Sequence, residues 1–473
     1  MIERKAYAKL LKWKEESPYK ALLVDGARQI GKTYLVEEFA RREFSSYVKV
    51  DFLRDERAPY LSQATSARDL IERLSLMVGR EVIPGETLVF FDEVQETPNL
   101  VTLSKYLVQD GRFRLVMSGS LLGVALKHVK SFPVGYLHIE TMFPLDFEEF
   151  CKSQGVTDSL WQTMREHFET ETPLEASLHE RLTKLFRLYI VVGGMPEAVD
   201  RYSCTHGDLG AVRDVHTELV GLYREDIAKY AKSRTLQVAS IYDAMPSQLD
   251  KENKRFELRS LKEKATFERY ANDFAWLVSA GAALKVPNVS EPKCPLKRTE
   301  EQNRFKLYAG DTGMLVSRYP ISVAMAIVSG ASDVNFGGVY ENVIAQELAS
   351  AFVVPRYYRH SRRGEVDFIG ETPSRQVVPI EVKSGKAYKR HVALTNLLSS
   401  SEYAIENAYV FSEANVSVEK REEKTVHYMP LYLAPFAIEK LAAEGIDAQD
   451  ELSRMGCAAE TLLVPPPSFA DFA

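Results

Sequence analysis

A short segment near the N-terminus places glycines, a lysine and a threonine at fixed spacing. Its sequence, Gly26-Ala-Arg-Gln-Ile-Gly31-Lys32-Thr33, fits the pattern G-x-x-x-x-G-K-[ST] at every position. The glycines let backbone N–H groups approach phosphate oxygens, Lys32 can reach the β- and γ-phosphates of a nucleotide, and the Thr33 hydroxyl can bind Mg²⁺. A helix that begins here directs the positive end of its dipole at the anion. We therefore predict that ATP and Mg²⁺ bind at this loop, through Gly26, Ala27, Arg28, Gln29, Ile30, Gly31, Lys32, Thr33 and Tyr34.

Two carboxylates follow the apolar run Thr87-Leu-Val-Phe-Phe. Strands that are covered on both faces are apolar throughout, and open α/β sheets bind their ligands beyond the carboxyl ends of the strands. At such a position Asp92 suits Mg²⁺, and Glu93 suits a general base that polarises the attacking water. Together with Lys32 on the phosphates, these residues predict ATP hydrolysis. The alternative interpretation is a strand that simply ends in solvated charge.

The segments that must hold these residues alternate between strands and helices over residues 20–150. The candidate strands are Ala21–Asp25, Tyr47–Asp51, Thr87–Asp92, Phe113–Ser118 and Tyr136–Glu140. This alternation predicts a parallel sheet with helices on both faces. Because one strand lies between the two motifs, the order resembles the additional-strand branch of P-loop ATPases. In that branch the next strand ends in a residue that senses the γ-phosphate, which here is Ser118, ahead of Ser120; the alternative is a turn that caps a helix.

A second group of charged residues lies in the C-terminal third of the chain. Glu341 opens an amphipathic helix, Asp367 lies in one strand-like run, and Glu381 and Lys383 lie in the next. Residues two apart in a strand share a face, so Glu381 and Lys383 should point the same way. The set resembles the PD-(D/E)xK nuclease core, in which carboxylates hold Mg²⁺ or Mn²⁺ and the lysine activates a water. The alternative is a nuclease fold that persists only as a binding scaffold.

The middle of the chain resembles a helical lid followed by a winged helix. Thr266–Ala280 would be the recognition helix, and the wing would begin at Ala282. From Lys251 to Arg298 the chain has 11 basic and 6 acidic residues, so this segment either contacts DNA or serves as a packing module. The predicted divisions are 1–150 for the ATPase core, 151–225 for the lid, 226–300 for the winged helix, 301–440 for the nuclease-like domain and 441–473 for a tail.

Five motifs occur in an order that resembles the AAA-type ATPases of the AAA_14 family, whose members carry a C-terminal DUF4143 region. The motifs are GARQIGKT, FFDEVQ, SGSLLG, PLDFEEF and GGMPEAV, and the C-terminal resemblance covers about residues 226–440. Family members typically have an arginine shortly before the fourth motif. This chain has Phe132-Pro-Val-Gly-Tyr136 there, so no arginine-finger role is carried over from that position. Arg224 is another basic candidate, or a solvated helix charge.

Composition excludes several other classes of protein. The 60 basic and 66 acidic residues give a net charge of -6, which argues against a chain that binds nucleic acid through overall charge. The four cysteines are widely spaced, so we expect neither a disulfide framework nor a cysteine zinc site. No apolar stretch is long enough to span a membrane and the N-terminus lacks an apolar signal region, so we expect a cytoplasmic protein without a membrane partner.

Two functional hypotheses follow. In the first, ATP hydrolysis is coupled to DNA binding or processing through the winged helix and the nuclease-like domain. In the second, the chain is a regulatory nucleotide switch that binds a protein partner or a second copy of itself, and the C-terminal domain is an inactive scaffold.

Overall fold

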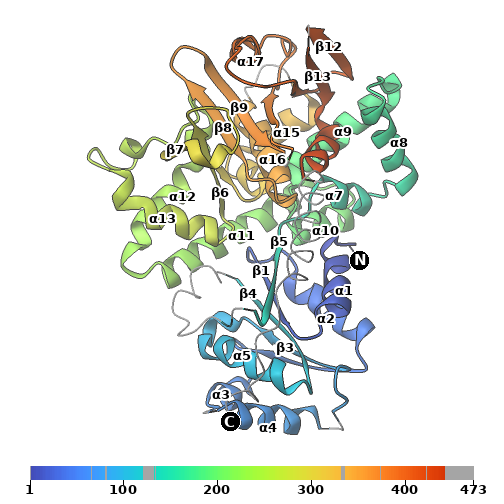
Figure 1. The fold of residues 1–473 in the computed structure, drawn as a ribbon, viewed down its shortest axis with the longest axis vertical. Coiled ribbons are helices and arrows are strands. Elements are labelled where there is room, and N and C mark those ends of the chain that lie inside the picture. The colour runs from blue at the N-terminus through green and yellow to red at the C-terminus, as the bar shows by residue number, and fades with distance from the viewer. Residues whose placement is uncertain are drawn as a thin grey trace, which may run out of the picture.

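The computed structural model describes residues 2–64, 66–79, 82–120, 133, 135–331, 336–372, 374–421 and 423–442. Two β-sheets lie at opposite ends of the molecule, and helices fill the space between them (Figure 1). None of the helices in the described ranges has the length and hydropathy that a membrane span requires. The predicted tail lies outside the described residues from 443 onward, as do Phe132 and Val134 of the segment without an arginine.

The N-terminal sheet has five parallel strands in the order β2-β3-β4-β1-β5. They are β1 (Ala21–Gly26), β2 (Ser46–Asp51), β3 (Thr87–Asp92), β4 (Arg114–Gly119) and β5 (Leu137–Met142). Each lies within two residues of its predicted bounds. Because β4 separates β3 from β1, the strand that ends in Asp92 is not adjacent to the strand that precedes the glycine loop, and the predicted additional-strand order is confirmed.

Helices cover both faces of this sheet, which explains why the inner strands β1, β3 and β4 are largely buried, whereas the edge strands β2 and β5 carry polar, half-buried residues. The helices are α1 (Ala6–Glu16), α2 (Lys32–Glu43), α3 (Ala58–Ser62), α4 (Ala67–Val78) and α5 (Pro98–Asp110). Successive residues of a strand point to opposite faces. Leu22 and Val24 of β1 therefore join the core with α1 and α2, whereas Leu23 joins the core with α4 and α5.

A helical block follows the sheet. Its members are α7 (Phe147–Ser153), α8 (Asp158–Glu169), α9 (Ala176–Val192), α10 (Pro196–Cys204), α11 (Leu209–Tyr230), α12 (Thr235–Leu249) and α13 (Phe267–Ser279). The GGMPEAV motif begins in the short break between α9 and α10. Gly193 has a φ of 71°, and a Cβ there would lie 2.4 Å from the carboxylate of Asp311. Gly194 packs equally tightly on Leu145, so this break joins the helical block to both neighbouring regions.

The C-terminal sheet has eight strands in the order β12-β13-β11-β10-β9-β8-β6-β7. They are β6 (Ala283–Val289), β7 (Glu300–Ala309), β8 (Arg356–His360), β9 (Gly364–Glu371), β10 (Val377–Val382), β11 (Asn407–Ser412), β12 (Ser417–Arg421) and β13 (Lys424–Pro430). The helices of this half are α14 (Thr312–Val316), α15 (Ile321–Ser329), α16 (Gly337–Ser350) and α17 (Val392–Leu398). Helix α16 is buried along nearly its whole length.

The expected wing is not a separate element. The strand that begins near Ala282 is β6, which pairs with β7 in an antiparallel hairpin and with β8 in parallel. The predicted boundary at residue 300 therefore falls inside one hairpin, because backbone pairing with β8 extends the C-terminal sheet across it. Helix α13 lies where the recognition helix was expected, but it buries Phe274 and Leu277.

Candidate functional site

The glycine loop lies between β1 and α2, at the carboxyl end of the parallel sheet. Gly26 has a φ of 145°, and a Cβ there would lie 2.3 Å from the Met142 carbonyl oxygen. Gly31 has a φ of 89° and directly precedes α2. Both positions therefore require glycine, one for close backbone approach and both for their left-handed conformation. The N–H groups of the first turn of α2 face the loop, as an anion site requires.

Lys32 is held within the loop. Its Nζ donates to the carbonyl oxygens of Gly26, at 2.9 Å, and Ala27, at 2.6 Å, and the residue is 8% exposed. Burial lowers the pKa of the Lys32 amine to about 8, although the charge of Glu93 opposes this shift. An anionic phosphate is a stronger acceptor than a carbonyl oxygen, so a nucleotide phosphate can replace the two carbonyl oxygens as the hydrogen-bond acceptor of the Lys32 amine.

Three of the predicted residues meet at the end of β3. The Thr33 hydroxyl donates to Asp92 Oδ2 at 2.9 Å, and the Ser118 hydroxyl donates to Asp92 Oδ1. Asp92 is 3% exposed and lies at the carboxyl end of its strand. A hydroxyl and a carboxylate side by side are a donor set that suits Mg²⁺, which binds few protein oxygens and keeps several waters.

A cation that was not predicted lies beside Asp92. Lys49, on β2, has its Nζ 3.3 Å from Asp92 Oδ2 and 2.6 Å from Glu37 Oε1 of α2. The amine therefore shares with Thr33 the same carboxylate oxygen. No local pattern around Lys49 indicates this role, because the contact depends on β2 pairing with β3.

Glu93 is held by different partners from those of Asp92. Its backbone has a φ of 55°, which turns its carboxylate away from the strand direction. Gln95 Nε2 and the Ser120 hydroxyl donate to Glu93 Oε2, the latter at 3.3 Å. Ser118 and Ser120 thus serve different carboxylates, and only Ser118 contacts the predicted metal ligand.

Part of the loop is engaged by the helical block. The Arg28 guanidinium forms an ion pair with Asp226 of α11, and the Tyr223 hydroxyl donates to the Arg28 carbonyl oxygen at 3.2 Å. A Cβ on Gly281 would lie 2.6 Å from the Ala27 side chain. Arg28 was predicted only as part of the nucleotide-binding loop, and its side chain instead connects that loop to α11.

Arg224, the other basic candidate for an arginine finger, contacts a neighbouring helix. Its guanidinium pairs with Asp243 of α12 at 2.8 Å, and its side chain is 54% exposed. The structure thus places this candidate against α12 and not beside the glycine loop.

A groove of about 780 Å³ opens beside the loop. It is lined by Gly31 of the loop, Tyr34 of α2, Tyr7 of α1, and Pro196 of the GGMPEAV motif. Arg4 forms part of its wall and donates to the carbonyl oxygens of Ile30, at 2.8 Å, and Phe143, at 2.7 Å. No sequence pattern indicates a role for this N-terminal segment, because a single arginine outside any motif carries no local signal.

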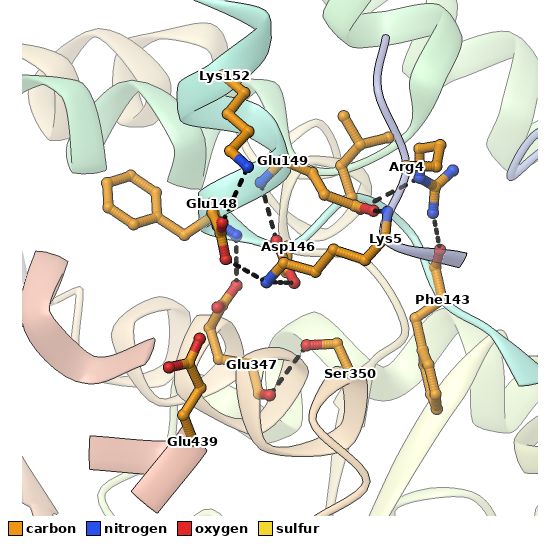
Figure 2. A network of polar contacts seen from close by, with 12 residues as sticks. Arg4, Lys5, Phe143, Asp146, Glu148, Glu149, Lys152, Glu347, Ser350 and Glu439 are labelled. Carbon is orange, nitrogen blue, oxygen red and sulfur yellow. Dashed lines mark hydrogen bonds and ion pairs between the residues drawn. The ribbon is translucent and has the colours of Figure 1, made fainter. Parts of the chain in front are cut away.

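The PLDFEEF motif connects three regions of the chain. Figure 2 shows Arg4 and Lys5 beside Glu149, with Glu347 of α16 approaching the same turn. Lys5 N donates to Glu149 Oε1 at 2.6 Å, and Phe147 N donates to Glu347 Oε1 at 3.0 Å. Hydrogen bonds of the PLDFEEF motif therefore connect the N-terminal segment that lines the groove to the buried helix α16 of the C-terminal half.

The four nuclease-type residues lie close together, as the sequence indicated. Asp367 Oδ2 accepts from Val382 N at 2.9 Å, beside Glu381, and Lys383 donates to Glu381 Oε2 at 2.6 Å. Burial and the charge of Asp367 raise the pKa of Glu381 to about 8. Glu341 has the opposite shift, because Lys306 and Lys254 outweigh the effect of burial and lower its pKa to about 2.

The donor set of this cluster does not fit the second metal that was hypothesised. Within the described ranges, no group of three or more His, Cys, Asp or Glu side chains is arranged to hold a metal ion. Lys306 of β7 lies among the carboxylates, with its Nζ 3.2 Å from Glu341 and 2.8 Å from Glu365. Lys306 was not predicted, since it precedes the nuclease-type motifs and reaches them only through the β6–β7 hairpin.

Comparisons with known proteins divide the chain into three parts. Residues 18–151 match the AAA domain family AAA_14, residues 183–323 match a domain of unknown function, DUF8612, and residues 336–433 match a domain of unknown function, DUF4143. The DUF4143 match is thus shorter than the predicted DUF4143 region, residues 226–440. Most of the residues in that region that lie outside the match belong to DUF8612. No curated protein matches the chain.

Two solved structures resemble parts of it. C. elegans PCH-2 is 15% identical, with a TM-score of 0.27, over 44% of this chain and 65% of that chain. The Thermotoga maritima RuvB Holliday junction branch migration motor is 13% identical, with a TM-score of 0.29, over 64% of this chain and 92% of that chain. The chain thus spans about two thirds of the length of the PCH-2 chain. The chain thus carries an AAA domain of the AAA_14 family and a DUF4143 domain, which is the domain pair that its motifs predicted.

Proposed function

We propose that this chain binds ATP with Mg²⁺ and hydrolyses the γ-phosphate bond. The observation that carries the proposal is the meeting of Thr33, Asp92 and Ser118 at the carboxyl end of β3, beside the buried amine of Lys32. When bound, Mg²⁺ supplies charge neutralisation on the β- and γ-phosphates. Thr33 and Asp92 would hold it, directly or through water.

The other residues of the site divide the remaining tasks. Lys32 would bind the terminal phosphates. Ser118, whose hydroxyl donates to Asp92, would sense the γ-phosphate. Glu93 would orient the attacking water and accept its proton, since a carboxylate near the phosphates suits a general base. The groove beside Tyr34 and Pro196 has room for the base and ribose.

Nucleotide binding and phosphate release test this proposal directly. Lys32→Ala should abolish binding of a fluorescent ADP and, with it, Mg²⁺-dependent phosphate release from ATP. The matched control is Lys184→Ala, because Lys184 is exposed and pairs only with a neighbouring turn of its own helix. Full turnover in Lys32→Ala would contradict the assignment of the loop.

The contacts of α11 support the switch hypothesis for what hydrolysis achieves. Asp226 pairs with Arg28 in the glycine loop, and Lys229 and Tyr230 contact Glu96, in the turn that follows Glu93. One helix therefore touches both segments that a nucleotide would move. We propose that ATP changes the position of α11 and so the surface offered to a protein partner or a second copy of this chain.

Hydrogen exchange tests this coupling. In the wild type, ATP should change the protection of α11, whereas Asp226→Asn should bind ATP without that change. Arg224→Ala is the control, because Arg224 lies on α11 but faces Asp243 of α12. An equal response of α11 in the wild type and Asp226→Asn would refute the coupling.

DNA binding is the second candidate. Exposed Arg259, Lys262 and Lys264 lie together in sequence just before α13, and they favour contact with a phosphate backbone. Fluorescence anisotropy with duplex and single-stranded DNA, with and without ATP, tests it. Binding that weakens steeply with salt and is lost when these three residues become glutamate would support it. If the protein binds no DNA and DNA does not change its rate of ATP turnover, the DNA-binding hypothesis is refuted and only the switch hypothesis remains.

A further inference from the structure

Lys306 is the most deeply buried charged residue of the C-terminal cluster. It is 0% exposed, and its Nζ lies 2.8 Å from Glu365, 3.2 Å from Glu341 and 3.7 Å from Asp367 Oδ1. A buried ammonium group is tolerated only where anions surround it. Three carboxylates from one helix and one strand therefore converge on a single internal cation.

Glu341, Asp367 and Glu381 each already have at least one carboxylate oxygen engaged by a donor. Glu341 Oε2 accepts from the Tyr308 hydroxyl at 2.7 Å, and Glu341 Oε1 lies 2.8 Å from Lys254. Asp367 Oδ2 accepts from a backbone amide, and Glu381 Oε2 accepts from Lys383. A divalent cation would have to displace several of these donors at once.

Displacement of Lys306 is unfavourable for a physical reason. Its side chain extends from the paired strand β7 and has no solvent-exposed surface, so the ammonium cannot turn into water as the amine of an exposed lysine can. If it stayed, a divalent cation among the same carboxylates would lie within a few ångströms of it. Like charges at such a separation in a poorly solvated site repel strongly.

The cations and the carboxylates come from different family segments. Lys254 and Lys306 lie in the part that matches DUF8612, whereas Glu341, Glu365 and Asp367 lie in the part that matches DUF4143. The cluster thus joins the two segments by ion pairs that are almost wholly buried.

We propose that the Lys306 ammonium neutralises Glu341 and Asp367, two of the carboxylates that would hold a divalent cation in a PD-(D/E)xK nuclease, so that the cluster joins the DUF8612 and DUF4143 segments and does not cleave phosphodiester bonds. The proposal is independent of ATP hydrolysis, because the glycine loop shares none of these residues.

Manganese titration of the nucleotide-free, full-length protein tests it, with free Mn²⁺ followed by electron paramagnetic resonance. The wild type and Asp367→Asn should give the same titration, because no Mn²⁺ binds at the cluster. Lys306→Met removes the ammonium and nearly preserves side-chain volume. It should gain one bound Mn²⁺ that the wild type does not bind. Addition of Asp367→Asn to Lys306→Met should abolish that gain.

Two results would overturn the proposal. One is Mn²⁺ binding by the wild type that Asp367→Asn or Glu381→Gln removes. The other is a folded Lys306→Met protein that binds no additional Mn²⁺. Should Lys306→Met fail to fold, the comparison of the wild type with Asp367→Asn still decides the matter. Plasmid cleavage with Mn²⁺ adds a further readout, since cleavage that Glu381→Gln abolishes would also refute the proposal. Asp92→Asn identifies any Mn²⁺ held at the glycine loop.

Discussion

Replacement of Glu347 by glutamine should change how the stability of this protein depends on pH. Glu347 lies on α16 and is 3% exposed. Its Oε1 accepts from Phe147 N at 3.0 Å and from the Tyr189 hydroxyl at 2.8 Å, so it caps the PLDFEEF turn. Glutamine keeps an oxygen acceptor at this position and cannot ionise. The variant therefore isolates the effect of the charge.

The expected magnitude follows from the pKa of Glu347. Burial and the nearby charge of Asp146 raise it from its ordinary 4.5 to about 8. Between these two values the unfolded chain releases a proton that the folded chain keeps, so the stability of the folded state falls as pH rises. At about 1.36 kcal/mol for each pH unit, the loss is at most about 5 kcal/mol by pH 8. Below pH 4.5 Glu347 should contribute no pH dependence.

Thermal and urea unfolding from pH 5 to pH 8.5 would measure this effect. Glu347→Gln should match the wild type near pH 5 and become progressively more stable than it as the pH rises. Glu148→Gln is the matched control from the same motif. Burial of Glu148 is outweighed by Lys5 and Lys152, which lower its pKa, so its charge stabilises the fold above that pKa. Its loss should destabilise the protein near pH 8. Stability curves of Glu347→Gln and wild type that run parallel across this range would refute the reasoning.

Three further predictions concern the ATP site. Glu93→Gln should keep nucleotide affinity and lower the rate of phosphate release about 10²–10⁴-fold, since it removes the general base; an unchanged rate would overturn that assignment. Lys49→Met should lower the Mg²⁺ concentration at which nucleotide affinity reaches half of its maximum, because it removes a cation 3.3 Å from Asp92; the same Mg²⁺ dependence as the wild type would show that Lys49 does not compete with the metal. Arg4→Ala should weaken nucleotide binding and cost about 1–3 kcal/mol of stability, as it leaves buried acceptors around the loop unpaired. Calorimetry beside Lys12→Ala, an exposed lysine of α1, would measure both effects, and equal values in the two variants would refute the role of Arg4.

Much of the N-terminal sheet could be read from local sequence. Strands β1, β3 and β4 contain apolar runs, and the alternation with helices allows few arrangements of a parallel sheet. The glycine loop is equally local as a motif, because its glycines, lysine and threonine lie within eight consecutive residues. The close approach at Gly26 is not local, since it involves the carbonyl oxygen of Met142. The meeting of Thr33 with Asp92 could also be anticipated, since parallel strands present their carboxyl ends along one edge.

The C-terminal half shows where such reasoning fails. Glu341, Asp367 and Glu381 were identified from their spacing, and they do lie close together. Spacing could not show that Lys306 lies among them, because that contact requires β6, which was assigned to the preceding domain, to pair with both β7 and β8 in one sheet. Backbone pairing of β6 with β8 is not encoded in any local pattern of side chains.

The sequence by itself determined which residues can bind phosphate and metal, because those groups are set by residue type and short spacing along one loop or strand. Only the tertiary structure decided how their charges are balanced. Lys49 beside Asp92, Asp226 beside Arg28 and Lys306 beside Glu341 are pairs from distant segments. Such pairs form because burial of a charge is unfavourable without a partner, and the fold chooses which distant residue supplies it.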